Sequence, residues 1–161
     1  MVQEYYTRVS GGKEKVSIEY KSDLAKGELV ETLRQHREKD RIFKYTTVGI
    51  QRDDFIFQMD GYPIRKCGSQ GQQKSFLVSL KFAQYEIMKS RYGYAPILLL
   101  DDLFDKLDMN RVSNLLQMVA GNDFGQIFVS DSNKVRISAI VDSVTSDSAY
   151  YDTVGGQFTR Q

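Results

Sequence analysis

Residues that build disulfide frameworks, metal centres and rigid turns are scarce in this chain. Its 161 residues include one cysteine, one histidine, two prolines and no tryptophan. A single cysteine, Cys67, excludes an internal disulfide framework and fits a reducing compartment. His36 and Cys67 form no cluster with zinc-ligand spacing, and His36 has no neighbouring nucleophile for a Ser–His–Asp arrangement. We expect His36 on a helix surface and Cys67 as a small buried side chain.

Long apolar runs and an excess of one charge are also missing. The longest fully apolar run, 95–100, is too short to span a bilayer, and the N-terminus has no signal-peptide core. Twenty-two basic and twenty-one acidic residues give a net charge of +1, so a phosphate-binding surface would have to be a local patch. With 41% hydrophobic residues, the chain can fold around a core. We expect a cytoplasmic protein without a membrane segment.

The first part of the chain shows both strand and helix patterns. Residues 22–43 follow the pattern of a charged amphipathic helix, capped by Ser22 or Asp23. Around it lie short stretches with the alternation or residue types that are typical of strands. Asp60-Gly61 favours a turn, and Pro63 disfavours a central strand. The expected strands are 15–21 (KVSIEYK), 45–50 (YTTVGI), 54–59 (DFIFQM) and a short edge strand within 60–66 (DGYPIRK).

The second part alternates helices and strands. From Gln70 to about Arg91 apolar residues recur at helical spacing, which predicts the longest helix. The stretch 95–102 (APILLLDD) is apolar without alternation, as in an inner parallel strand buried on both faces. This order predicts a single α/β domain over residues 1–161, with a parallel sheet core, flanking helices and a few additional strands. The remaining expected elements are a helix at 110–121, a strand at 125–130, a helix at 134–142 and a closing strand and turn at 149–160.

Two acidic residues end the apolar strand. Asp101 and Asp102 lie at its carboxyl end, where ligands bind in open α/β sheets. They could cap loops or pair with lysines, or they could form a Mg²⁺ and phosphate site in which one acid holds the metal and the other orients a water. The turn "CGSQGQQKSF" before the long helix supports the second interpretation, because N–H groups and the dipole at a helix N-terminus favour a phosphate. Alone, this turn would be an ordinary helix cap.

Taken together, "GSQGQQKSFLVSLKFAQ" and "ILLLDDLFDKLD" resemble the RecF family, bacterial recombinational-repair ATPases of the ABC type that are related to the SMC proteins. "YTTVGIQRDDF" and "GYPIRKCGSQGQQ" are similar to the stretches that lead into the signature helix of that family, and "GQIFVSDSN" is similar to its switch strand. The resemblance covers most of the chain and implies the C-terminal lobe of an ABC-type ATPase head.

The turn before the long helix resembles the ABC signature sequence. The matching residues are Ser69, Gln70, Gly71 and Gln72. The resemblance implies that Ser69 and Gly71 contact the γ-phosphate of an ATP that is held mainly by the other protomer.

Other roles follow from the same resemblance. Asp101 is similar to the Walker B acid that supports Mg²⁺, and Asp102 stands where the catalytic acid lies. Asp108 resembles the D-loop residue that crosses the dimer interface, and Ser130 a γ-phosphate sensor. Gln51 stands where the family often has a histidine, and no role is assigned to it.

The resemblance also implies partners. It predicts a homodimer that forms on ATP binding and that binds DNA, single-stranded or at junctions with double-stranded DNA. ATP and Mg²⁺ are the expected cofactors. The family role is the repair of gapped DNA, in which RecO and RecR act with it to load RecA, within DNA replication, recombination and the SOS response.

A P-loop, GxxxxGK[ST], is absent, although such an ATPase needs one. The nearest imitation, "SGGKEK", fails because Glu14 follows Gly12-Lys13 and Thr7 occupies the first glycine position. We therefore expect a C-terminal fragment that is inactive alone. Two alternatives stay open: a non-catalytic ABC-like interaction or dimerisation module, and half of another SMC-like ATPase, which would show the long heptads that are not visible here.

Overall fold

The computed structural model describes residues 1–121 and 124–161, which form two compact units. One unit joins Met1–Glu14 to Ser69–Gln161, and the other is Lys15–Gly68. The expectation of a single domain over 1–161 stays a prediction, since compact units within one chain need not be independent domains.

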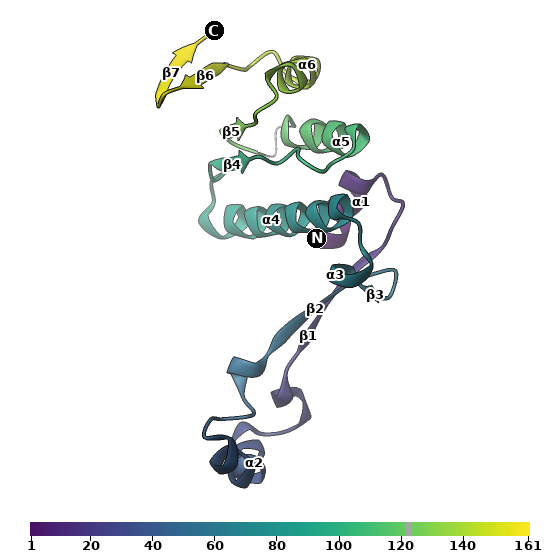
Figure 1. Ribbon diagram of the computed structural model, residues 1–161, viewed down its shortest axis with the longest axis vertical. Coiled ribbons are helices and arrows are strands. Elements are labelled where there is room, and N and C mark those ends of the chain that lie inside the picture. Colours follow the sequence, from purple (N-terminus) through teal and green to yellow (C-terminus); the bar gives the residue numbers. More distant parts are fainter. Residues whose placement is uncertain (122–123) are drawn as a thin grey trace. The chain divides into compact units, whose positions relative to one another are not determined.

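The larger unit is built around α4 (Gln70–Tyr92), which confirms the helix expected at 70–91. Helix α1 (Val2–Ser10) packs against α4 and α5 (Met109–Val119), and α6 (Lys134–Val144) packs against α5 (Figure 1). Each helix contributes an apolar face to one core. Among the core residues are Val9, Phe82, Tyr85 and Leu115.

Strands β4 (Leu98–Asp101) and β5 (Ile127–Ser130) form a parallel pair in which Asp101 lies opposite Ser130. Helix α5 connects them, so the expected parallel α/β core is confirmed. The expectation that 95–102 is buried on both faces is wrong for this chain. Leu98 and Leu100 are buried, but Leu99 is 71% exposed and Phe128, opposite it on β5, is 53% exposed.

A hairpin of β6 (Tyr151–Val154) and β7 (Gln157–Arg160) confirms the closing strand and turn. Gly155 and Gly156 both have positive φ, 57° and 80°, as the tight turn of such a hairpin requires.

The smaller unit is an antiparallel sheet, in the order β1-β2-β3, with one long helix and three short helical turns. The strands are β1 (Val16–Lys21), β2 (Asp54–Met59) and β3 (Tyr62–Pro63). The helix expected at 22–43 is interrupted. Ser22 caps a 3₁₀ turn, η1 (Asp23–Lys26), and α2 (Leu29–Phe43) begins only after Gly27.

The strand expected at 45–50 is wrong. Asp40 of α2 accepts hydrogen bonds from the hydroxyl (2.7 Å) and the N–H (2.8 Å) of Thr47, and these two bonds lower the pKa of Asp40. Because this N–H is already bonded, it does not join a sheet ladder, and the segment continues into the 3₁₀ helix η2 (Ile50–Arg52). Cys67, expected to be buried, ends α3 (Ile64–Cys67) and is exposed. Within the described part of the chain, no helix has the length and apolarity to cross a bilayer.

Candidate functional site: a capped turn, a neighbouring loop and two strand ends

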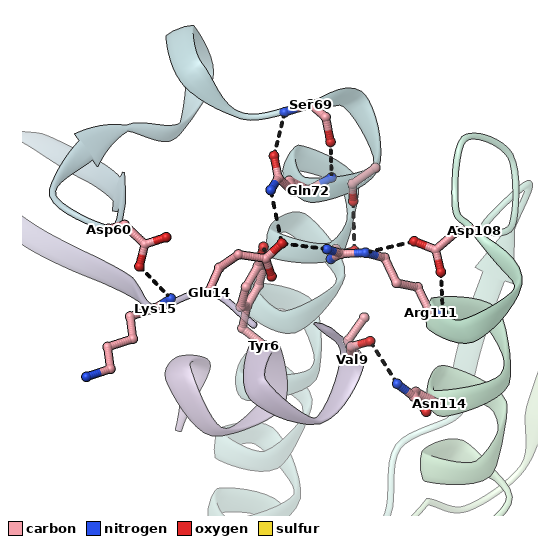
Figure 2. Close-up of polar contacts among 12 residues, drawn as sticks. Tyr6, Val9, Glu14, Lys15, Asp60, Ser69, Gln72, Asp108, Arg111 and Asn114 are labelled. Atoms are coloured by element: carbon pink, nitrogen blue, oxygen red, sulfur yellow. Dashed lines mark hydrogen bonds and ion pairs between the residues drawn. The ribbon is translucent and has the colours of Figure 1, made fainter. Parts of the chain in front are cut away.

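The polar turn at the start of α4, residues 69–72, forms a helix cap. The Ser69 Oγ accepts a hydrogen bond from the Gln72 N–H at 3.2 Å, and the Gln72 Oε1 accepts one from the Ser69 N–H at 2.7 Å (Figure 2). This reciprocal pair is a capping box. Since the Ser69 Oγ is the acceptor here, its hydroxyl proton can be donated to a ligand. The N–H groups of Gln70 and Gly71 lie in the first turn, where a helix offers them no partner of its own.

Gly71 allows the loop that follows β4, residues 102–108, to touch the 69–72 turn. An ideal Cβ at Gly71 would lie 2.9 Å from the backbone carbonyl oxygen of Lys106, closer than real Cβ contacts. A glycine in a helix costs about 1 kcal/mol relative to alanine. At this position glycine leaves room for the contact between turn and loop, which an alanine Cβ would fill.

A buried arginine connects the 69–72 turn and the 102–108 loop. Arg111 is 8% exposed, and its guanidinium donates to the Glu14 Oε1 (2.8 Å) and the Asp108 Oδ2 (3.2 Å) (Figure 2). It also donates to the Ser75 Oγ at 3.0 Å. No role for Arg111 or Glu14 was predicted from the sequence. A signal existed for Arg111, which lies four residues before Leu115 on the buried face of α5. For Glu14 no local signal existed, because its partner is 97 positions away.

Glu14 is the second centre of this network. Its Oε1 also accepts a hydrogen bond from the Gln72 side-chain amide at 3.0 Å, and its Oε2 accepts one from the Tyr6 hydroxyl at 3.5 Å. Burial raises the pKa of Tyr6. For Arg111, burial acts to lower the pKa, but the contacts with Tyr6 and Glu14 outweigh this effect and raise it. Arg111 therefore stays charged in a place that solvent barely reaches.

Asp108 begins α5. Its Oδ1 accepts a hydrogen bond from the Arg111 N–H at 2.9 Å, and this bond, aided by the charge of Arg111, lowers the pKa of Asp108 although burial opposes it. The side chain remains 61% exposed. Asp108 is thus fixed by α5 and still open to a group outside the chain.

Asp101, Asp102 and Ser130 meet at the carboxyl ends of β4 and β5. The Ser130 hydroxyl donates to the Asp101 carboxylate, and the Asp102 N–H donates to the Ser130 carbonyl oxygen at 3.2 Å. Asp102 has a φ of 46°, in the left-handed region, where the chain leaves the strand. Its carbonyl oxygen accepts a hydrogen bond from the Lys74 Nζ at 2.7 Å, which ties this end of the sheet to α4. The three predicted residues therefore lie together, and all three are exposed.

Comparison with known proteins identifies the family. No protein-family model matches the chain. It is 47% identical over 139 residues to the DNA replication and repair protein RecF of Flavobacterium johnsoniae, a match that covers 86% of this chain and 39% of that protein. It is 38% identical over 160 residues to the DNA replication and repair protein RecF of Phocaeicola vulgatus, covering 99% and 43%. The chain belongs to the RecF family.

Solved structures agree with this assignment. The structure of the recombination mediator protein RecF-ATPrS in the RecFOR pathway has a TM-score of 0.70 and 26% sequence identity, and the match covers 99% of this chain and 42% of that one. The chain spans about two fifths of the length of the curated RecF proteins it matches, and corresponds to their C-terminal part. The expected family and the expected α/β class are confirmed.

The segment that imitates a P-loop has another structure here. "SGGKEK" follows helix α1 and leads into β1, whereas a P-loop leads from a strand into a helix. Gly11 ends α1 in the left-handed conformation, with a φ of 71°. Its glycines therefore serve a helix end, and its Glu14 serves the Arg111 network.

The strand ends have the donor chemistry for Mg²⁺. Mg²⁺ binds through one or two carboxylates, waters and substrate phosphates, and Asp101 and Asp102 supply carboxylate oxygens. In the portion of the chain described, no group of three or more His, Cys, Asp and Glu residues could hold a metal. Asp101 and Asp102 would thus supply one or two of the oxygen ligands that such an ion needs.

Proposed function

We propose that this chain forms the C-terminal part of an ATP-hydrolysing RecF that dimerises on ATP and binds DNA, single-stranded or at single-strand/double-strand junctions. The supporting observation is that the 69–72 turn and Asp108 are held in one network, in a chain whose Asp101, Asp102 and Ser130 meet at the strand ends. The turn and Asp108 would face the ATP of a partner subunit. The strand ends would serve an ATP held by a P-loop outside these 161 residues.

The 69–72 turn supports this proposal through its hydrogen-bond donors. The Ser69 hydroxyl and the N–H groups of the first turn of α4 would donate to the γ-phosphate, whose charge the helix dipole favours. Gly71 would let the phosphate approach the backbone closely. Gln70 and Gln72 complete the turn, and Gln72 holds it in the capping box.

At the strand ends each residue takes a different part. Asp101 would hold Mg²⁺, which when bound neutralises phosphate charge. Asp102 would orient the attacking water and accept its proton. The Ser130 hydroxyl would donate to the γ-phosphate in place of its present acceptor, the Asp101 carboxylate.

The biological role proposed is that of the RecF family. The ATP-bound dimer would act on gapped DNA and, with RecO and RecR, load RecA. Hydrolysis would release the dimer from DNA, because each nucleotide stabilises the dimer only while it remains bound to both subunits.

Two substitutions in the complete protein test the residue roles. Asp102→Asn should slow ATP hydrolysis by at least tenfold and preserve ATP-dependent dimerisation, because a general base typically contributes at least 10²-fold. Asp105→Asn, which changes an exposed carboxylate of the same loop, is the matched control. Ser69→Arg should block dimerisation by filling the γ-phosphate position. Normal turnover in the first variant, or an ATP-dependent dimer in the second, would contradict the assignment.

A calorimetric titration separates this proposal from a non-catalytic interaction module, which the missing P-loop favours. The 161-residue chain alone should not bind ATP and Mg²⁺, and binding should appear when the P-loop-bearing part of the protein is supplied. If it stays absent with that part present, the non-catalytic module is the better interpretation. If the chain alone binds ATP at micromolar concentrations, the inference that it carries only part of the ATP site is wrong.

A further inference from the structure

We infer that Arg111 and Glu14 are positioning residues that hold the 69–72 turn and Asp108 in one fixed arrangement, so that both engage the partner subunit as a unit. The inference rests on the proposed function, in which the turn and Asp108 face the partner's ATP. Neither Arg111 nor Glu14 would touch ATP.

A continuous chain of polar contacts carries this inference. It runs from the Asp108 carboxylate to the Arg111 guanidinium, on to the Glu14 carboxylate and the Gln72 side-chain amide, and ends at the Ser69 N–H (Figure 2). Its contacts measure 3.2, 2.8, 3.0 and 2.7 Å in that order. Every contact is thus within hydrogen-bond distance. A displacement of Asp108 would therefore lengthen contacts that also hold the 69–72 turn.

A second route reaches the same turn. Arg111 also donates to the Ser75 Oγ at 3.0 Å, and the Ser75 hydroxyl donates to the Gly71 carbonyl oxygen at 2.7 Å. Ser75 is fully buried. Gly71 in turn touches the backbone of Lys106 in the 102–108 loop. Two hydrogen-bonded routes and one steric contact therefore join the turn to the loop.

The choice of residue types points to positioning rather than to stability alone. The side chains of Arg111 and Glu14 are only 10% and 13% exposed, and buried ion pairs often stabilise a protein no more than apolar residues of the same size. A guanidinium, however, presents donors in a rigid planar fork. Here the guanidinium reaches acceptors on three different segments: Glu14 in the segment after α1, Ser75 on α4 and Asp108 at the start of α5.

The clearest test replaces Ser75, which is outside the proposed ATP contacts. Ser75→Ala removes the Arg111 acceptor and the bond to Gly71. Ser79→Ala is the matched control, because Ser79 is equally buried and its hydroxyl donates to the Ser75 carbonyl oxygen at 2.7 Å, the same bond one turn later, without an Arg111 contact. Arg111→Lys, which keeps the charge but lacks the fork, is the second variant.

Two readouts are needed in the complete protein. The first is the ATP-dependent dimer affinity, by sedimentation, beside the affinity of the separate subunit for a fluorescent ATP analogue. The second is the distribution of distances between spin labels at Leu77 on α4 and Met109 on α5, both exposed, without nucleotide and with every native cysteine, Cys67 among them, replaced by serine. Ser75→Ala and Arg111→Lys should weaken the dimer at least tenfold and broaden the distribution. Subunit affinity for the analogue should stay within twofold, and Ser79→Ala should match the parent in both readouts.

The outcomes separate the two proposals. The proposed function fails if the parent protein does not dimerise on ATP, or if the Ser69→Arg variant still dimerises. In that case the spin-label distances alone decide whether Arg111 fixes the 102–108 loop. If the parent dimerises while Ser75→Ala and Arg111→Lys dimerise equally well, the inference is overturned. An unchanged distance distribution in both variants overturns it as well, and so does an equal loss in Ser79→Ala, which would indicate helix stability alone.

Discussion

Replacing Gly71 by alanine tests the contact between the 69–72 turn and the 102–108 loop by the sign of its effect. In a helix without tertiary contact at this position, alanine would raise the free energy of unfolding by up to about 1 kcal/mol, because it has the higher helix propensity. In this protein the added Cβ would lie 2.9 Å from the Lys106 carbonyl oxygen. The structure therefore predicts destabilisation.

The size of the effect follows from how firmly the loop is held. Ordinary contacts begin at 3.4 Å, so the loop or the helix would have to retreat by 0.5 Å (3.4 − 2.9). The loop buries Leu103, Phe104 and Leu107, and Lys74 binds its first carbonyl at 2.7 Å. Overpacking against such a segment costs about 1–3 kcal/mol, from which the propensity gain is subtracted. We expect a net loss of about 1 kcal/mol, or about 3 °C in Tm for a chain of this size.

Urea unfolding of the 161-residue chain, followed by circular dichroism, measures this difference. Gln70→Ala is the control, because Gln70 is the preceding, exposed residue of the same turn. It should change the free energy of unfolding by less than about 0.5 kcal/mol. If Gly71→Ala instead stabilises the chain, the turn and the loop do not touch as described, and one link of the positioning network is lost.

Three further predictions concern other parts of the larger unit. The pKa of Asp108 is lowered by folding, so its carboxylate stabilises the fold above about pH 4, and this contribution is lost as the pH falls through the folded pKa. Asp108→Asn keeps a capping oxygen but has no carboxylate to protonate. When the pH is lowered from about 5 to about 3, the free energy of unfolding of this variant should therefore fall less than that of the parent. An equal fall in both proteins would contradict this. Tyr85→Phe removes a buried hydroxyl that donates to the Pro96 carbonyl (3.1 Å) and accepts from the Gly125 N–H (3.0 Å), and denaturant unfolding should show a loss of about 1–3 kcal/mol. Leu99 and Phe128 form an exposed apolar face through which we expect the 161-residue chain to self-associate; Leu99→Lys places a charge there and should reduce this association in sedimentation velocity, and unchanged association would exclude this face as the contact.

Elements with a local signal at both ends were predicted well from the sequence. Helix α4 was expected at 70–91 and spans Gln70–Tyr92, because Ser69 supplies the cap at its start and Gly93, with a φ of 75°, ends it. A closing strand and turn were predicted at 149–160, where Gly155-Gly156 favours the turn, but the second strand of the hairpin was not predicted. The failure at 45–50 has the opposite cause. β-branched residues favour a strand there, but a side chain of α2 takes the Thr47 N–H.

The candidate site divides in the same way. Ser69, Asp101, Asp102, Asp108 and Ser130 could be proposed from the sequence because each lies in a stretch that resembles a RecF motif, and their roles stay predictions. Their mutual contacts were not predictable, since Arg111 and Glu14 meet only when α1, α4 and α5 pack together. "SGGKEK" resembles a P-loop but departs from it at Glu14, and Glu14 is the residue that binds Arg111 in the structure.

The exposed face of β4 shows how a sequence pattern can fit a complete protein and yet disagree with the exposure of residues in one part of it. An uninterrupted apolar strand is typical of parallel sheets covered on both faces. Yet Leu99 is 71% exposed, and α2, all of whose residues the structure describes, has no buried residue. Pattern and exposure agree if these surfaces are covered in the longer RecF proteins, of which the chain spans about two fifths. The 69–72 turn and Asp108 differ from them because they are polar, capped and bonded within the chain. Their exposure is therefore stable without covering by another part of the same protein. Exposed polar groups that are held in place in this way suit a surface that meets a partner subunit.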